Sequence, residues 1–348
     1  MQTKFNNSNS NSLALVAESK LPLVSVVIPV YDVEQYVEEA LDSVLAQSYE
    51  SIEILIVDDG SPDSSISIIQ KIYSDSRIRI IRQGNRGLAG ARNTGIRNAN
   101  GRYIAFLDSD DFWNKNKLEL HIELMQQHSN CGVSFCSSSF IDDDSKVLGR
   151  LQSPKKKADY QAKDIFCRNP IGNGSAPVIS LGILEQIGFE TADKTDNGVP
   201  YTQYFDESLG QSEDVECWTR IAILTATDFY YIDQPLTYYR LNSRGLSANV
   251  EKQFETWMRL LNKLEQYAPN FARQYGPVAK AFQYRYLARR SIFQGQAGDA
   301  LKFMWLAFKT KPMALLSELS RTMETIIAGL VLICLSQELQ KKIVDRFF

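Results

Sequence analysis

The stretch "YIAFLDSDDFW", residues 103–113, joins five mostly apolar residues to three carboxylates within four positions. The apolar part has the length and the aromatic and β-branched character of a strand. The carboxylates follow at once, without an intervening polar turn. This stretch therefore predicts a buried strand that ends in an acidic loop.

Three earlier runs resemble this strand, namely "VSVVIPV" (24–30), "IEILIV" (52–57) and "RIRIIR" (77–82). Segments of helical period separate them, and between Val33 and Leu45 apolar residues recur at i, i+3, i+4, i+7 and i+8. The order is β-α-β-α-β-α-β. Because nearly continuous apolar strands with helical crossovers bury both faces of a sheet, the pattern predicts an α/β fold with a mostly parallel sheet flanked by helices.

The remainder of the chain is less regular. The run "GVSFCSSSF" (132–140) predicts a further strand, whereas residues 141–163 are polar and are expected to form a solvated loop. A helix is expected to begin near Ser212, because Ser-Glu-Asp suits a helix N-terminus. From about residue 251 to the end, only helical patterns remain.

Composition excludes several classes of protein. The 348 residues carry a net charge of −3 with a pI near 5.6, which supplies no basic field for nucleic acid. The five cysteines are scattered without C-x-x-C spacing, which is typical of reduced, cytoplasmic proteins. The first twenty residues lack a secretory apolar core, and "IIAGLVLICL" (326–335) is too short to span a bilayer.

Carboxylates gather where the strands of the predicted sheet end. Asp58 and Asp59 follow the second strand, and Asp108, Asp110 and Asp111 follow the fourth. In an open parallel sheet the ligand lies outside the carboxyl ends of the strands. Side chains at i and i+2 of an extended segment point the same way, so Asp108 and Asp110 can converge on one cation. Carboxylate oxygens favour Mg²⁺ or Mn²⁺, ions that commonly join a protein to a diphosphate.

Helix capping is the alternative explanation for these aspartates, and it suits Asp63 and Asp111. It accounts for one aspartate per loop but not for "DSDD" together with "DDGSPD". The two histidines, His121 and His128, are expected on a solvated helix surface rather than at a metal. The chain lacks the P-loop and H-E-x-x-H patterns, and the glycines at 84, 87 and 90 do not form the dinucleotide fingerprint but favour a tight turn.

Four stretches in this order resemble the family 2 glycosyltransferases of GT-A fold. They are "SVVIPVYD" (25–32), "ILIVDDGSPDSS" (54–65), "GNRGLAGARNTGIRNANGRYIAFLDSDD" (84–111) and "FDESLGQSEDVECWTR" (205–220). The resemblance covers roughly residues 23–245. It implies a Rossmann-like catalytic domain (23–250), while the Asn/Ser-rich composition before it predicts a disordered tail (1–22) and the patterns after it predict a C-terminal helical region (251–348). Within the catalytic domain, residues 23–140 would form the nucleotide-binding half and 141–250 the acceptor half.

The resemblance implies roles for individual residues, carried over position by position. Residues implied to bind a nucleotide-sugar donor, usually a UDP-sugar, are Pro29, Tyr31, Asp58, Asp59, Arg92 and Asp108. Asp110, with Asp108, would hold Mn²⁺ or Mg²⁺ on the diphosphate, and Asp214 falls at the position of the catalytic base. Glu213 and Trp218 would lie on the acceptor side, although a large aromatic residue such as Trp218 also suits a protein core. These roles fit inverting transfer, in which a base deprotonates an acceptor hydroxyl opposite the leaving group.

This sequence departs from the family pattern at two places. Asn242 stands where many relatives carry a histidine that contributes to the metal site, so metal affinity is in question. The second departure is an insertion of about fifteen residues within 187–207, directly before the Glu213-Asp214 pair. It is interpreted either as an acceptor-side loop or as a passive surface insertion.

Two other functions remain open, a scaffold for an envelope-polysaccharide complex and nucleotidyl transfer that makes sugar nucleotides. The expected acceptor is a saccharide or a lipid-linked molecule. The protein is expected in the cytoplasm, where its helices from about residue 313 would pack on the catalytic domain or rest on the membrane surface.

Overall fold

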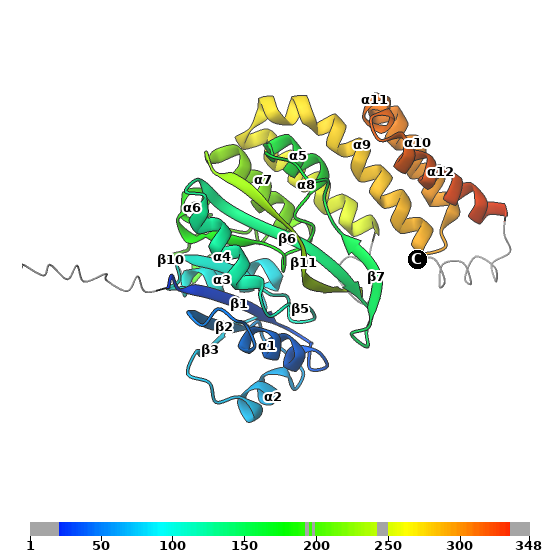
Figure 1. Ribbon diagram of the computed structural model, residues 1–348. Coiled ribbons are helices and arrows are strands. Elements are labelled where there is room, and N and C mark those ends of the chain that lie inside the picture. Colours follow the sequence, from blue (N-terminus) through cyan, green and yellow to red (C-terminus); the bar gives the residue numbers. More distant parts are fainter. Residues whose placement is uncertain (1–20, 192–194, 197–198, 242–249, 335–348) are drawn as a thin grey trace, which may run out of the picture.

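The structure is a computed structural model that describes residues 21–191, 195–196, 199–241 and 250–334. A sheet with helices on both faces forms the N-terminal two thirds, and a layer of long helices covers one side of it (Figure 1). The predicted α/β class with a C-terminal helical region is confirmed. The expected tail at 1–22 lies almost wholly outside the described residues.

The main sheet follows the strand order β3-β2-β1-β4-β8-β6-β11-β5, and β7 pairs with β6. Its strands are β1 (Val24–Val30), β2 (Ile52–Asp58), β3 (Ile78–Arg82), β4 (Tyr103–Phe106), β5 (Phe112–Trp113), β6 (Cys131–Ile141), β7 (Val147–Gln152), β8 (Val178–Ser180) and β11 (Asp228–Arg240). The first four are parallel to one another, as predicted. Between β4 and β6 lies β8, which is antiparallel to both, so the sheet is mixed at its centre.

Each face of the sheet carries its own core. The helices of this part are α1 (Val37–Leu45), α2 (Ser65–Ile72), α3 (Gly87–Arg97), α4 (Lys117–Gln127), α5 (Ala162–Arg168), α6 (Leu181–Ile187) and α7 (Glu213–Leu224). Apolar residues of α1, α2 and α4 share one core, and those of α3, α5, α6 and α7 share the other. Helix α3 packs very closely on β1, since a methyl group at Gly95 would overlap the side chain of Val27.

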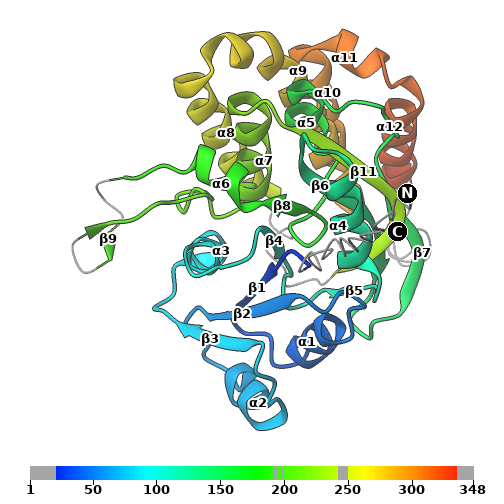
Figure 2. The ribbon, with the colours of Figure 1, turned by 60° about the vertical axis from the view of Figure 1, so that its left-hand side comes forward.

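One segment differs from its predicted structure, and the insertion has a short hairpin of its own. The polar stretch 141–163, expected as a loop, contains β7, whose alternating exposed and half-buried residues pair with β6. Because one face of β7 is exposed and the other only half-buried, its sequence lacks the regular apolar alternation on which the prediction of a strand depends. The insertion contains a short hairpin of β9 (Thr195–Asp196) and β10 (Val199–Pro200), which projects from the body in Figure 2.

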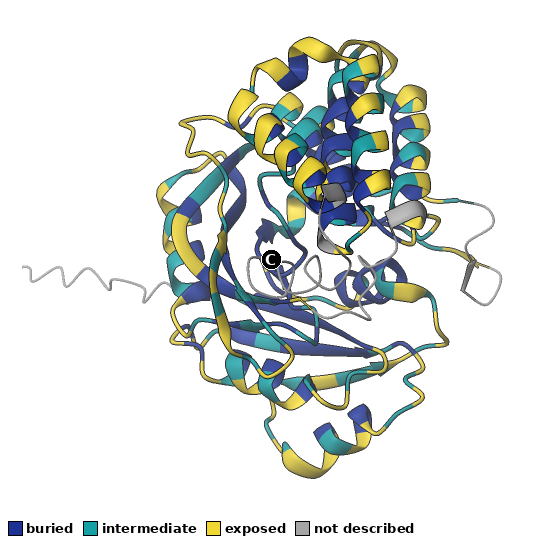
Figure 3. Ribbon diagram, turned by 90° about the vertical axis from the view of Figure 1, so that its right-hand side faces the viewer, coloured by how far each residue is buried: buried dark blue, intermediate teal, exposed yellow. Residues whose placement is uncertain are grey.

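The C-terminal helices are α8 (Val250–Tyr267), α9 (Pro269–Phe293), α10 (Ala297–Thr310), α11 (Pro312–Leu316) and α12 (Leu319–Cys334). A third core joins α8 and α9 to the sheet half through Phe166 of α5 and through Val215 and Ile223 of α7. Figure 3 shows the buried residues of these helices facing inward and exposed residues on their outer side. No helix within the described ranges is long and apolar enough to cross a membrane.

Candidate active site at the carboxyl edge of the sheet

The loops after β1 and β2 form one side of the candidate site. Asp32 after β1 has a φ of 55°, and its N–H donates to the Ser61 hydroxyl at 2.9 Å, which ties the two loops together. Pro29 is buried within β1, whereas the side chain of Tyr31, just past the strand, is 48% exposed at the edge. The two residues therefore frame the end of β1, and their contact with a nucleotide stays a prediction.

The two aspartates after β2 are held differently. Asp58 accepts from the backbone N–H of Ser61 at 3.0 Å. Asp59 is buried and accepts from the Gln83 amide at 2.7 Å and from the Arg86 N–H at 2.8 Å. Burial raises the pKa of Asp59 above its ordinary value, although these donors oppose that shift. The loop therefore presents an oriented carboxylate at this edge, as the resemblance implied, and its recognition of a base stays a prediction.

Two hydrogen bonds to the Ser175 hydroxyl hold the acidic loop after β4. The Ser175 hydroxyl accepts from the Asp108 N–H at 3.0 Å and donates to the Asp111 carboxylate at 2.7 Å. Asp111 also accepts from the N–H of Arg240 at 2.9 Å and is 1% exposed. Asp111 thus closes the loop rather than capping the following helix, which corrects the capping interpretation of this residue.

Arg240, at the end of β11, binds the same loop from the other side. Its guanidinium donates to the backbone oxygens of Asp110 and Asp142 and to the Glu39 carboxylate, at 2.8, 2.6 and 2.7 Å. The side chain is fully buried, and the guanidinium lies 4.3 Å from the centre of the Tyr36 ring. Asp110 is half-buried between these contacts. The backbone that carries Asp110 is consequently fixed at the edge.

Arg92 links the acidic loop to helix α7. Its guanidinium donates to Asp108 at 2.6 Å and to Glu213 at 2.9 Å, and the residue is 1% exposed. The Arg92 guanidinium therefore binds two carboxylates at once, next to the carboxyl edge of the sheet. That Arg92 lies near the nucleotide base or diphosphate, as the resemblance implied, stays a prediction.

Glu213 and Asp214 open helix α7, as predicted for a helix near Ser212. Ser212 has a φ of 61°, an uncommon left-handed conformation for a non-glycine residue that often accompanies functional sites. Burial raises the pKa of Glu213 to about 7, with the charge of Asp214 adding to the shift and Arg92 opposing it. Burial also raises the pKa of the half-buried Asp214 carboxyl. A carboxylate with a raised pKa at the end of a helix is suited to accept a proton.

Trp218 lies in the core, which is the alternative that its size already suggested, and its place on the acceptor side stays untested. Its side chain is fully buried and packs edge-on against Phe205 with ring centres 5.6 Å apart. It does lie four residues after Asp214 on the same helix, but this face of α7 turns toward the core of the sheet. Sequence spacing gave the correct helix face without showing that the face is buried.

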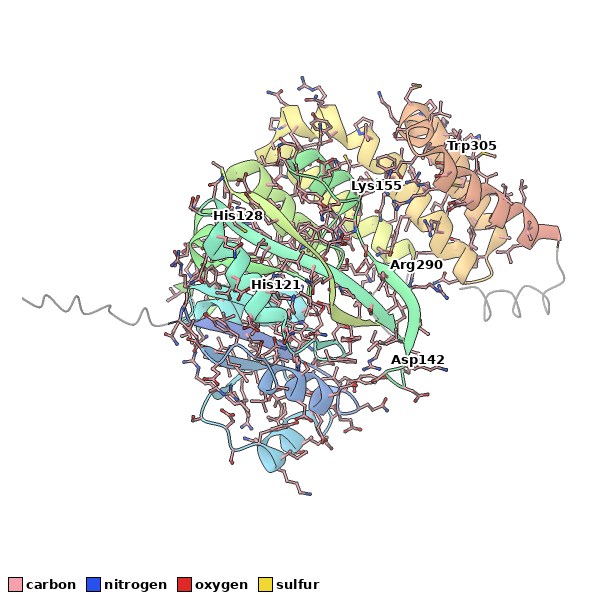
Figure 4. The ribbon with its side chains drawn as sticks, in the orientation of Figure 1. His121, His128, Asp142, Lys155, Arg290 and Trp305 are labelled. Atoms are coloured by element: carbon pink, nitrogen blue, oxygen red, sulfur yellow. The ribbon has the colours of Figure 1, made fainter. Side chains whose placement is uncertain are left out.

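His121 is likewise not on a solvated surface. It is fully buried, with Nδ1 2.6 Å from the Ser134 hydroxyl and Nε2 3.1 Å from Lys117 Nζ (Figure 4). Lys117 also donates to the backbone oxygen of Ala176 at 2.7 Å, next to Ser175. Burial and the neighbouring ammonium lower the pKa of His121, which keeps the ring neutral. His128 is half-buried and stacks on Tyr230 at 4.3 Å.

The segment "GNGSA" (172–176) was missed by sequence reasoning, although it supports the whole site. Beside Ser175, Gly174 lies so close to Arg92 that a β-carbon would overlap its Nη2 atom. The available signal was the run Gly172-Asn173-Gly174, because closely spaced glycines allow the backbone to approach a functional side chain. Asn242 lies outside the described residues, as does part of the insertion.

We expect Gly174→Ala to reduce turnover at least tenfold, because the added methyl group displaces the Arg92 guanidinium from Asp108 and Glu213. Steady-state kinetics measure the effect. Gly182→Ala is the matched control, since a methyl group there would meet only the Ser180 hydroxyl at 4.0 Å. Equal turnover in both variants would show that Arg92 needs no fixed position.

The donor set fits a divalent cation that is shared with a ligand. Asp108 and Asp110 offer hard oxygens at the edge, and the side chain of Asp108 keeps 20% exposure beside Arg92. Within the described part of the chain, no group of three or more histidine, cysteine, aspartate or glutamate residues is placed to hold a metal. Two protein carboxylates suit Mg²⁺ or Mn²⁺, which take further oxygens from a diphosphate and water.

The fold of this open, mixed α/β sheet is shown by solved structures that superpose on it, which have the GT-A fold. The mannosyltransferase PcManGT from Pyrobaculum calidifontis, solved with GDP-Man and Mn²⁺, superposes with a TM-score of 0.55 over 90% of this chain and 87% of that one. At 18% identity, this likeness concerns the fold alone.

Relatives in sequence identify the family. Residues 25–188 match the family model of glycosyl transferase family 2. TuaG of Bacillus subtilis, named for teichuronic acid biosynthesis, is 44% identical over 239 residues, which cover 68% of this chain and 86% of TuaG. WfaP of Escherichia coli, a UDP-Glc:alpha-D-GlcNAc-diphosphoundecaprenol beta-1,3-glucosyltransferase, is 33% identical over 237 residues, which cover 67% of this chain and 83% of WfaP. The chain belongs to glycosyltransferase family 2.

Proposed function

We propose that this enzyme transfers a sugar from a nucleotide-sugar donor, a UDP-sugar, to a hydroxyl group of a saccharide or lipid-linked acceptor in polysaccharide or glycolipid biosynthesis. The observation that carries the proposal is the buried Arg92, which connects Asp108 at the end of β4 with Glu213 beside Asp214. The guanidinium of Arg92 thereby holds the acidic loop at a fixed distance from the start of helix α7, which carries the candidate base. Such fixed spacing suits a direct displacement between two bound substrates.

In this proposal the residues divide the chemistry. Asp214 accepts the proton of the acceptor hydroxyl, which then attacks the anomeric carbon on the face opposite the diphosphate, so the configuration is inverted. Asp110 and Asp108 would hold the divalent ion, which when bound offsets charge on the departing diphosphate. Asp58, Asp59, Pro29 and Tyr31 line the donor side. The UDP-Glc donor and diphosphoundecaprenol-linked acceptor in the name of WfaP support these substrate classes.

Asp110→Asn is expected to weaken UDP binding in Mn²⁺ by at least tenfold, because the variant loses the anionic oxygen that links the cation to the protein. Isothermal titration calorimetry with UDP, with and without Mn²⁺, measures the change. The exposed Asp299 of α10 supplies the matched control, Asp299→Asn. Unaltered metal-dependent affinity in Asp110→Asn would remove this residue from the metal site.

A donor and acceptor array with mass spectrometry of the products tests the function itself. A sugar-acceptor conjugate together with free UDP supports the proposal. Binding of UDP without any transfer would favour the scaffold function, and formation of a sugar nucleotide from a sugar phosphate and a nucleoside triphosphate would favour nucleotidyl transfer.

A further inference from the structure

Helices α11 and α12 carry an apolar stripe that no described part of the chain covers. Two large apolar side chains of α11 and five of α12 are each 44–68% exposed, and those of α12 recur mostly at spacings of three or four residues. We call this stripe the C-terminal apolar face: Met313, Leu316, Leu319, Met323, Ile327, Leu330 and Val331. The opposite side of α12 is buried through Thr322, Thr325 and Leu332. The helix is therefore amphipathic in place, with its apolar side turned outward.

Exposed basic and aromatic residues lie on α10, the helix that packs against α12, and just after it. Lys302, Lys309 and Lys311 are exposed, and the exposed acidic residues of α10 and α12 are Asp299 and Glu324. Trp305 is 60% exposed on the outer side of α10, and the ammonium of Lys309 lies 5.0 Å from its ring centre (Figure 4). Tryptophan and lysine beside an exposed apolar stripe are typical of helices that lie in the headgroup region of an anionic bilayer.

Charge distinguishes a lipid surface from a second copy of the chain. A second copy would add its own three lysines, and the exposed acidic residues of α10 and α12, Asp299 and Glu324, are fewer than the lysines that they would have to pair. Anionic headgroups supply the opposite charge, and the acyl boundary accepts the apolar side chains. We propose that the C-terminal apolar face, with Trp305 and the three lysines, docks the enzyme on the anionic surface of a lipid bilayer.

The placement of this face agrees with the candidate site. In Figure 1, β1 runs from left to right, so the carboxyl edge of the sheet lies on the right, where α12 also ends. Docking with the end of α12 toward the bilayer would place the carboxyl edge on the bilayer side of the molecule. An advantage of that position for a lipid-linked acceptor rests on the proposed function, whereas docking itself does not.

Vesicle co-sedimentation of the full chain, without donor or acceptor, tests the docking. We expect wild-type protein to bind phosphatidylglycerol-containing vesicles and to bind phosphatidylcholine vesicles far more weakly. Ile327→Gln/Leu330→Gln should reduce binding by roughly tenfold per side chain. Replacing Lys302, Lys309 and Lys311 by glutamine should reduce binding to anionic vesicles by roughly fivefold per lysine at low salt.

The matched control is Ile72→Gln/Leu151→Gln, whose side chains are 50% and 55% exposed on the sheet half, compared with 53% and 50% for Ile327 and Leu330. Melting temperatures show whether each variant is folded. Wild-type protein that binds neither vesicle, or equal binding by both pairs of variants, would overturn the proposal. Sedimentation equilibrium showing a lipid-free dimer that Ile327→Gln/Leu330→Gln dissociates would overturn it in favour of a second copy. Because no substrate is present, these results are independent of the transfer assay.

Discussion

Asp214→Asn is expected to lower the turnover number by roughly 10²–10⁴-fold, because the amide keeps the shape of the side chain but cannot accept the proton of the acceptor hydroxyl. Donor affinity should be nearly unchanged, since Asp214 lies on helix α7 rather than in the acidic loop. Steady-state kinetics together with calorimetry of UDP binding separate the two quantities.

Two measurements make this prediction specific. The structure raises the pKa of Asp214 above its ordinary value of 3.8, so turnover in the wild type should fall on acidification at a higher pH than an exposed aspartate would give. The product anomer should be inverted relative to the donor. Asp233→Asn is the control, because the side chain of Asp233 is 60% exposed on β11. A retained configuration, or near-wild-type turnover in Asp214→Asn, would remove Asp214 as the base.

Arg92→Met is expected to lower the free energy of unfolding by about 3–5 kcal/mol, because it leaves two buried or half-buried carboxylates without their shared partner. Arg92→Lys should recover only part of this loss, since one ammonium cannot reproduce two separate guanidinium contacts. Denaturant unfolding measures both variants. The companion substitution Glu213→Gln in the Arg92→Met background should restore stability, because it removes one of the unpaired charges.

The same variant has a defined pH dependence. The folded-state pKa of Glu213 is raised from 4.5 to about 7, so the stability linked to its protonation is complete below pH 4.5 and is lost as the pH rises through 7. Arg92 opposes this shift, and its removal raises the pKa of Glu213 further. Arg92→Met should consequently be more destabilising at pH 8 than at pH 5. A loss of unfolding free energy that does not vary with pH would show that the destabilisation of Arg92→Met does not come from the unpaired charge of Glu213.

The sequence was sufficient for the parallel half of the sheet because β1, β2 and β4 are almost wholly buried and therefore nearly continuous apolar runs, and because the edge strand β3 keeps its isoleucines between exposed arginines. The bounds of β1 match the predicted run, and the acidic loops follow β2 and β4 as expected. Segments with one exposed face were harder to recognise. The alternating residues of β7 resemble a polar loop, and β8 is only three residues long.

Long-range contacts account for what sequence reasoning missed at the site. Ser175 meets Asp108 and Asp111 across more than sixty positions, and Arg240 meets Asp110 across 130. No local pattern marks such partners. His121 shows the converse limit, because it was correctly expected on a helix but on a solvated surface, whereas the side chain is fully buried.

The antiparallel strand β8 has a consequence for the order in which this protein is made. β4 ends at Phe106 and pairs with β1 on one side, but its neighbour on the other side, β8, begins only at Val178. While the ribosome synthesises the intervening residues, the N-terminal half can assemble with one edge of β4 still open. An unpaired apolar edge is a template for pairing with another chain. Slower translation of the segment between Phe106 and Val178 should therefore increase aggregation of the nascent protein. Chains that extend through Ser180 should aggregate less than chains that end before Val178.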